Sequence, residues 1–253
     1  MGTAAVEVGG HAVRNHAPGS IPKAVKVAFT AFMAVLVPSY WHFYGPTNFV
    51  YFCDLALILT LIGIWAESAL LVSMCAVGIL APQALWVADF AGGLVGHPIV
   101  GMTAYMFRPD SSLFLRGLSL FHGWLPFLLA YLVWRTGYDR RAWAAWSALA
   151  VAVLAFCWTF LPPPMPDAGY LPVNVNYVWG MDDAAAQTWM PPLAWLACLM
   201  VGIPLLLSGP THLALKRLVP AAPRHQARGS ARIRPVAGDA PRGGSVIPDA
   251  AVP

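Results

Sequence analysis

Six apolar runs of roughly membrane-spanning length dominate this sequence and restrict the folds open to it. About 20 apolar residues in a helix cross the hydrocarbon core of a bilayer, because a helix rises about 1.5 Å per residue. Backbone amides inside a bilayer must be bonded within the protein, which favours helices for runs of this length. The predicted spans are residues 24–41, 48–65, 69–89, 117–134, 142–161 and 191–208.

The composition supports the same class of fold. The 253 residues are 58% hydrophobic and only 10% charged, a balance typical of integral membrane proteins. We therefore predict an all-α, polytopic membrane helix bundle with six transmembrane helices and short loops. A seventh crossing is possible over residues 92–107, which are apolar but interrupted by glycine and proline. Residues 1–22 are predicted to be a flexible N-terminus, 23–208 the bundle, and 209–253 a disordered basic tail.

The basic residues predict the orientation of the bundle. With six spans, Lys23 and Lys26, the loop at residues 135–141 and the tail after Lys216 all fall on one side. The positive-inside rule makes this the cytoplasmic side, so both termini are expected there. The loop at residues 165–190, which has three aspartates and no lysine or arginine, then lies outside. We expect a protein integral to the inner (plasma) membrane of a bacterium.

The same observations limit the expected partners. The net charge of +4 comes from residues beside the spans and in the tail, so we expect membrane lipids, and no nucleic acid, as partners. The four cysteines all lie in apolar runs without C-x-x-C spacing. They therefore indicate neither a disulfide framework nor a zinc site. No metal and no other cofactor is expected.

Cys53 and Asp54 place a thiol beside a carboxylate inside a predicted span. Ionisable residues within a membrane are costly and usually functional. In the six-span topology, Cys53 and His122 lie at similar depth, each about five residues or ~8 Å below the outer boundary. A thiol near an imidazole is the minimum for nucleophilic catalysis. Asp54 would orient His122 or hold a water molecule.

Simpler explanations exist for most of these residues. A cysteine in an apolar helix is usually a small apolar residue, and a membrane histidine is more often a polar contact between helices than a base. Asn174 and Asn176 are turn formers or, alternatively, hydrogen-bond donors to an oxyanion. We count them, with Asn48 and Tyr51, as candidate substrate-binding residues.

Three segments carry a resemblance to a known family: PTNFVYFCDLALILTLIG, FHGWLPFLLAYLVW and NVNYVWG. Together they resemble the YwaF-like bacterial integral membrane proteins, a family whose animal relative is transmembrane protein 164. The resemblance covers residues 40–208. It implies a catalytic pair with Cys53 as nucleophile and His122 as base, and a phospholipid acyltransferase or lipid-ester hydrolase activity.

The leading hypothesis is therefore acyl chemistry on membrane lipids through a Cys53 thioester. A second reading is a non-enzymatic membrane protein, such as a small transporter or an assembly component, with Asp54 and His122 as an intramembrane polar relay. A metal or haem site built from His42, His97 or His122 with Cys53 comes third, because the spacings match no ligand motif.

Overall fold

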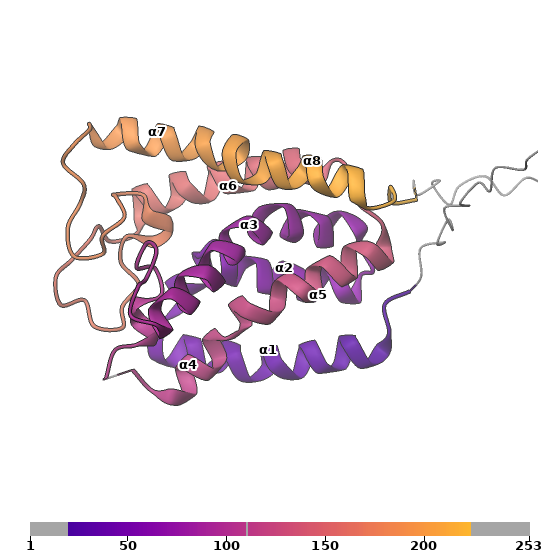
Figure 1. Cartoon of the computed structure of the whole chain (residues 1–253), viewed down its shortest axis with the longest axis horizontal. Helices are drawn as coiled ribbons and strands as arrows, with labels where there is room; N and C mark the ends of the chain where they lie inside the picture. Colours follow the sequence, from indigo (N-terminus) through magenta and orange to yellow (C-terminus); the bar gives the residue numbers. More distant parts are fainter. Residues whose placement is uncertain (1–19, 110, 224–253) are drawn as a thin grey trace, which may run out of the picture. The chain divides into compact units, whose positions relative to one another are not determined.

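The computed structural model describes residues 20–109 and 111–223, and this part of the chain is helical. Its only strand-like pairing is an isolated bridge between Tyr138 and Ala221. In chain order the helices are α1 (Lys23–Tyr44), α2 (Phe52–Trp65), α3 (Ala69–Leu94), α4 (Leu113–Ser119), α5 (Phe121–Thr136), α6 (Ala142–Phe160), α7 (Pro192–Gly202) and α8 (Gly209–Leu218) (Figure 1). The predicted all-α fold is confirmed.

Five stretches are long and apolar enough to cross a membrane: Lys23–Tyr44, Ala69–Leu94, Leu113–Thr136, Ala142–Phe160 and Pro192–Leu218. The sixth apolar helix, α2, has 14 residues and therefore rises only about 21 Å. A 3₁₀ helix, Pro46–Val50, precedes it. The chain is thus a membrane protein, and each of the six predicted spans contains an apolar helix.

Helix α3 is the centre of the bundle. It packs against α2, α5, α6 and α8, and 56% of its most apolar window is buried, against 22% for α1 and for α6. The α2–α3 hairpin is as short as predicted, and Ser68 caps α3 by accepting a hydrogen bond from the Leu71 amide at 3.3 Å. The outer helices therefore assemble around α3.

The helix ends that carry most of the basic residues meet at one end of the bundle, here called the basic end. Lys26 at the start of α1 forms a 2.8 Å ion pair with Glu67 in the α2–α3 turn. Arg135 near the end of α5 donates to the Ser20 carbonyl at 2.7 Å. The Tyr138 amide donates to the Pro220 carbonyl, just after α8. Successive apolar stretches therefore run in opposite directions, with α4 continuing into α5 and α7 into α8 (Figure 1).

The connection between α3 and α4 does not form a seventh crossing. Helix α3 continues beyond the predicted Asp89 to Leu94, and the described residues between there and Leu113 contain only the 3₁₀ helix Ala104–Met106. Gly96 and Gly101 take positive φ angles of 79°, which suit glycine but not a continuing helix. This segment folds back over the end of the bundle opposite the basic end.

The predicted end of the last span at Ser208 was wrong. After α7 the chain passes through a π-helical segment, Ile203–Ser208, and continues as α8 to Leu218. The Trp143 indole of α6 donates to the Pro204 carbonyl at 3.0 Å, so the altered turn does not leave that acceptor unpaired. The basic tail predicted from residue 209 therefore begins with ordered helix, and residues 1–19 and 224–253 lie outside the described residues.

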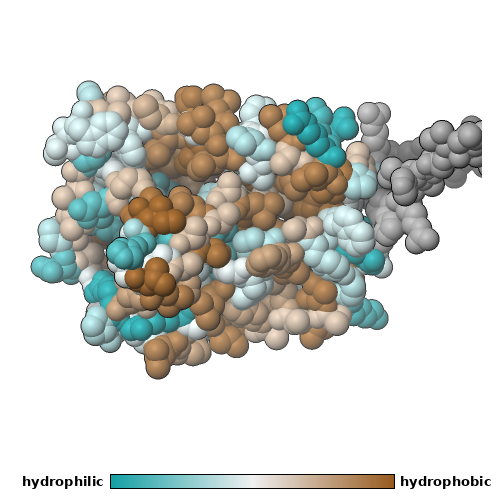
Figure 2. Space-filling view, in the orientation of Figure 1, coloured by the Kyte–Doolittle hydropathy of each residue, from teal (hydrophilic) through white to brown (hydrophobic). Residues whose placement is uncertain are grey.

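The surface of the helices is apolar where lipid would surround it. Figure 2 shows hydrophobic residues over the middle of the bundle and hydrophilic residues toward the two ends of the helices. Large side chains that are at least half exposed include Val27, Ile62, Phe127, Phe160, Leu193 and Leu206. Because a water-soluble protein rarely exposes so much contiguous apolar surface, these side chains are suited to contact acyl chains.

Gly78 sets the closest approach between α3 and α6. A Cβ atom added there would lie 1.9 Å from Cε2 of Trp146, a side chain that is 1% exposed. The indole therefore fills the space that a side chain would need, and α6 could not keep its position against any larger residue.

We predict that Gly78→Ala destabilises the bundle by about 1–3 kcal/mol, because Trp146 or helix α6 must shift. Denaturant unfolding of the detergent-solubilised protein measures this cost. Gly123→Ala in α5 is the matched control, since nothing lies within 4 Å of its added Cβ, and it should be neutral or stabilising by up to about 1 kcal/mol. Equal effects of the two substitutions would contradict the packing role of Gly78.

Candidate functional site

The Cys53–Asp54 pair lies in the first turn of α2, at the end of the bundle opposite the basic end. Asp54 is only 4% exposed. Its Oδ2 accepts a 3.1 Å hydrogen bond from the Asn48 amide group, which the preceding 3₁₀ helix holds in place. The Cys53 thiol lies 3.8 Å from the same oxygen. The carboxylate oxygen Oδ2 is therefore contacted by two side chains that are close to Asp54 in sequence.

The other oxygen of Asp54 is different. Oδ1 is buried and has no hydrogen-bond partner. Among residues 20–109 and 111–223, no ion pair involves Asp54. A buried carboxylate without a cation or a full set of donors is costly, so such a group usually takes up a proton or receives a ligand. Asp54 is the strongest chemical signal in the described part of the molecule.

Two tyrosine hydroxyl groups lie within reach of the charge of this carboxylate. The hydroxyls of Tyr40 and Tyr44 on α1 lie close enough to Asp54 for its charge to act on them. Tyr40 forms a buried 3.0 Å hydrogen bond with Ser119 at the end of α4. Their position in the sequence did not indicate this role, because aromatic residues at the end of a span resemble ordinary interfacial anchors.

Tyr105 extends the same cluster from the loop between α3 and α4. Its hydroxyl accepts a 3.3 Å hydrogen bond from the Trp86 indole. Burial raises the pKa of the Tyr105 phenol above its usual value, the Trp86 indole lowers it, and the Cys53 thiol and the Ser119 hydroxyl also act on it. The loop therefore brings a neutral hydroxyl group toward α2.

His122 does not pair with Cys53 in this structure. Its Nδ1 lies 2.8 Å from the Ser119 carbonyl, one turn earlier. Its ring stacks on Trp86 at 4.8 Å and on Phe121 at 4.0 Å between centroids. Within the described residues, no hydrogen bond joins the imidazole to the thiol. The predicted catalytic pair therefore remains a prediction, and the contact that the thiol makes is with Asp54.

Asn176 has a structural role that its sequence context did not indicate. Its Oδ1 accepts a 3.0 Å hydrogen bond from the Phe52 amide, and its Nδ2 donates to the Val50 carbonyl at 3.0 Å. The residue before α2, Tyr51, makes no side-chain capping bond. Asn176 therefore caps α2 from a loop that is 124 residues away in sequence.

Asn174 and Tyr51 are also bonded within the fold. The Asn174 amide group donates to the Gly180 carbonyl at 2.9 Å and to the Asp182 carbonyl at 3.1 Å. The Tyr51 hydroxyl donates to the Val173 carbonyl at 3.4 Å. Burial raises the pKa of the Asp183 carboxyl, and the Asn174 amide group opposes that shift. The amide donors of Asn174 and Asn176 are thus satisfied by the chain, and nothing here supports the predicted oxyanion role.

Asp89 is a second buried carboxylate, and its sequence position marked only the expected end of the third span. Its oxygens accept hydrogen bonds from the amides of Val100, Gly101 and Thr103 and from the Thr103 hydroxyl, at 2.7–2.9 Å. Four donors satisfy this carboxylate completely, in contrast to Asp54. Asp89 therefore fastens the α3–α4 loop that carries Tyr105 to the end of α3.

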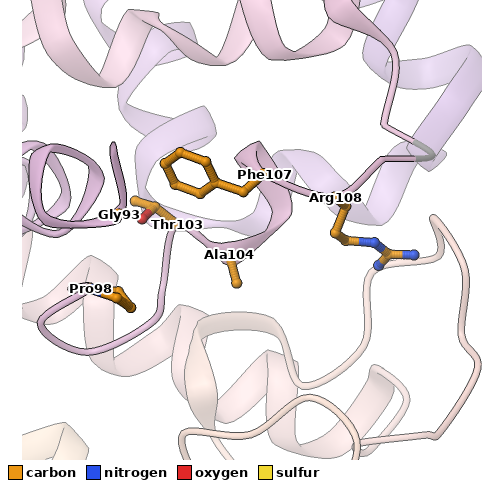
Figure 3. Close-up of a pocket in the computed structure, with 6 residues that line it drawn as sticks. All are labelled: Gly93, Pro98, Thr103, Ala104, Phe107 and Arg108. Atoms are coloured by element: carbon orange, nitrogen blue, oxygen red, sulfur yellow. The ribbon is translucent and has the colours of Figure 1, made fainter. Parts of the chain in front are cut away.

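A cavity of about 320 Å³ lies in that loop and is lined mainly by apolar atoms. Figure 3 labels its lining residues, Gly93, Pro98, Thr103, Ala104, Phe107 and Arg108. None of them is a predicted site residue. The Phe107 ring packs over Gly93, where an added Cβ would meet it at 2.4 Å. We assign the cavity to loop packing, because no titratable cluster faces it.

Within residues 20–109 and 111–223, no group of three or more His, Cys, Asp or Glu side chains is placed to hold a metal ion. The possible ligands His42, His97 and His122 lie on separate parts of the chain, and Cys53 faces Asp54.

Comparisons of the chain with protein-family models, with curated proteins and with solved structures found no match. The resemblance to the YwaF-like proteins therefore stays a prediction.

We predict that Asn176→Gly destabilises the protein by about 1–3 kcal/mol, because it leaves the Phe52 amide and the Val50 carbonyl unpaired. Glycine keeps the positive φ of 59° at this position, so the change tests the side chain alone. Asp167→Gly is the control, since Asp167 is exposed and has a φ of 62°. Unfolding curves that coincide for both variants would contradict the capping role.

We also predict that Asp89→Asn loosens the α3–α4 loop, since an amide group cannot accept both Thr103 bonds at the Oδ2 position. Hydrogen exchange read by mass spectrometry should show faster exchange over residues 95–107, with little change in the first half of α3. The expected local loss is about 1–3 kcal/mol. Asp167→Asn should leave exchange unchanged. Unaltered protection of the loop in Asp89→Asn would show that other contacts hold it.

Proposed function

We propose that this chain is a multi-pass membrane protein that uses Asp54 as the central group of an intramembrane polar relay for protons. The observation that carries the proposal is the buried Oδ1 of Asp54, which has no partner. Inside a bilayer, such a carboxylate is tolerated when it binds a proton or a cation. The relay was the alternative reading of the sequence, and the contacts favour it over a Cys–His catalytic pair.

The surroundings of Asp54 suit proton transfer. Asn48 fixes one carboxylate oxygen at 3.1 Å and leaves the other free to change protonation state. Tyr40 and Ser119 form a hydroxyl pair at 3.0 Å between α1 and α4. Hydroxyl groups both donate and accept hydrogen bonds, so they can pass protons without bearing a lasting charge. His122 lies next to the hydroxyl pair, because its Nδ1 is 2.8 Å from the Ser119 carbonyl. Its ring also stacks on Trp86.

The distribution of charged residues supports one orientation of the bundle in the membrane. The basic end carries Lys23, Lys26, Arg135, Arg140, Arg141, Lys216 and Arg217, with Glu67 and Asp139 as its acidic residues. We place this end in the cytoplasm of a bacterial inner membrane by the positive-inside rule. In that orientation Asp54 lies near the outer surface. The partners of the protein are then the membrane lipids that surround the bundle.

A second candidate is lipid acyl chemistry at Cys53. The observation that favours it is the contact between the Cys53 thiol and the Asp54 carboxylate at 3.8 Å. A carboxylate can accept the thiol proton, after which the thiolate attacks the acyl carbon and the departing alcohol takes up a proton. In this scheme Asp54, rather than His122, is the neighbouring base, a departure from the pair that the YwaF-like resemblance implies.

The relay predicts proton flux that depends on Asp54 and not on Cys53. The purified protein is placed in liposomes with an internal pH dye, and a potassium diffusion potential drives protons across the membrane. We expect wild type and Cys53→Ser to acidify the lumen faster than empty liposomes. Asp54→Asn should reduce the rate to that of empty liposomes, because an amide cannot take up the proton.

Asp139→Asn is the matched control, since Asp139 is a carboxylate outside the spans that pairs with Arg141. Wild-type flux no greater than that of empty liposomes would overturn the relay. An acyl adduct on Cys53 after exposure to an activated lipid ester, lost in Cys53→Ala, would favour the second candidate instead.

A further inference from the structure

The connection between α5 and α6 is fastened to the end of α8. The Tyr138 amide donates to the Pro220 carbonyl at 2.8 Å, and the Ala222 amide donates to the Tyr138 carbonyl at 3.0 Å. Gly137 permits this contact, because its φ is 81° and an added Cβ would lie 2.7 Å from Cα of Ala222. The two segments are therefore held in a defined register at the basic end.

This contact fixes His212 on α8. The Tyr138 hydroxyl lies 2.6 Å from Nδ1 of His212, and Tyr138 is 1% exposed. The Trp143 ring packs against the imidazole with 5.8 Å between centroids. When Tyr138 donates to Nδ1, the hydrogen of the neutral imidazole lies on Nε2, which then serves as a donor.

Two positively charged side chains lie near this imidazole. Arg140 and Lys216 lie close enough to His212 for their charges to act on its ring. Lys216 follows His212 by one helical turn and therefore shares its face of α8. Both cationic side chains are exposed. In the described part of the chain no carboxylate pairs with either, because Asp139 is bonded to Arg141 at 2.7 Å and Glu67 to Lys26 at 2.8 Å.

We propose that Arg140, His212 and Lys216 form a binding site for the phosphate of an anionic lipid headgroup. Arginine and lysine bind phosphate in many proteins, and the imidazole adds a donor at Nε2 when Tyr138 donates to Nδ1. The proposal is independent of the function of Asp54, which lies at the other end of the bundle.

The position of the site argues for a lipid rather than a free anion. The apolar stretch Pro192–Leu218, long enough to cross a membrane, ends beside Lys216. Leu213 and Leu218, on either side of Lys216, are 51% and 78% exposed, which suits contact with acyl chains. Trp143 lies beside His212, in the first turn of α6, as aromatic residues do at a bilayer interface. Cations at this depth meet headgroup phosphates.

The experiment titrates delipidated full-length protein in detergent with phosphatidylglycerol or phosphatidylcholine and counts bound lipid by native mass spectrometry. Wild type should retain phosphatidylglycerol in preference to phosphatidylcholine. Arg140→Gln and Lys216→Gln should each weaken that retention about fivefold, and the double variant should lose the preference. The single variants keep the test informative if the double variant unfolds.

The matched control is the double variant Arg141→Gln with Arg217→Gln. It changes the net charge by the same amount on the same two segments, but Arg141 is paired with Asp139, and Arg217 points about 100° away from Lys216 around α8. Retention close to wild type supports a defined site. A loss equal to that of the first double variant would show general attraction to anions and overturn the proposal.

Two further outcomes would also overturn it. One is a wild-type protein that binds both lipids equally. The other is displacement of phosphatidylglycerol by an equal concentration of inorganic phosphate, which would identify a free anion as the ligand. Displacement only by excess phosphatidylglycerol supports the lipid headgroup.

Discussion

Polar groups within this bundle must find partners inside the protein, because a bilayer offers none. Side chains from distant parts of the sequence supply several of these partners. Asn176 caps α2, and Trp143 donates to the Pro204 carbonyl in the π-helical segment. Four donors form hydrogen bonds with the carboxylate of Asp89. Each contact joins two helices or a helix and a loop, so satisfying the backbone also fixes the arrangement of the helices.

Asp54 is the carboxylate among the buried groups of the described residues that have an atom without a partner, and it contrasts with Asp89. Both carboxylates are buried. Asp89 is saturated by donors and serves the fold, whereas Asp54 keeps one oxygen without a partner. A residue retained only for stability would gain from a full set of donors or from an apolar replacement. The incomplete satisfaction of Asp54 is therefore better explained by a group that enters and leaves, such as a proton.

The sequence predicted the features that depend on local chemistry. Apolar run length was sufficient to locate an apolar helix within each predicted span. The cap of α2 could not be found in this way, because Asn176 is distant in sequence and resembles a turn former. The end of α8 was missed because Gly209 and Pro210 normally stop a helix, and a preceding π-helical turn changes which amides need partners. Depth also placed His122 at the level of the site, but depth does not determine which way a side chain points around its helix.

The two ends of the bundle differ in chemistry, and this difference connects the two proposals. In the proposed orientation, anionic lipid at Arg140, His212 and Lys216 would hold α8 and the α5–α6 connection at the cytoplasmic surface. Helix α3 contacts both α8 and α2, so this anchoring also limits how far α2 can move along the membrane normal. Asp54 would then stay near the outer surface. The loop that Asp89 fastens carries Tyr105, which lies near Cys53 and Ser119, so in the proposed relay this loop would set which hydroxyl groups a proton meets on its way to Asp54.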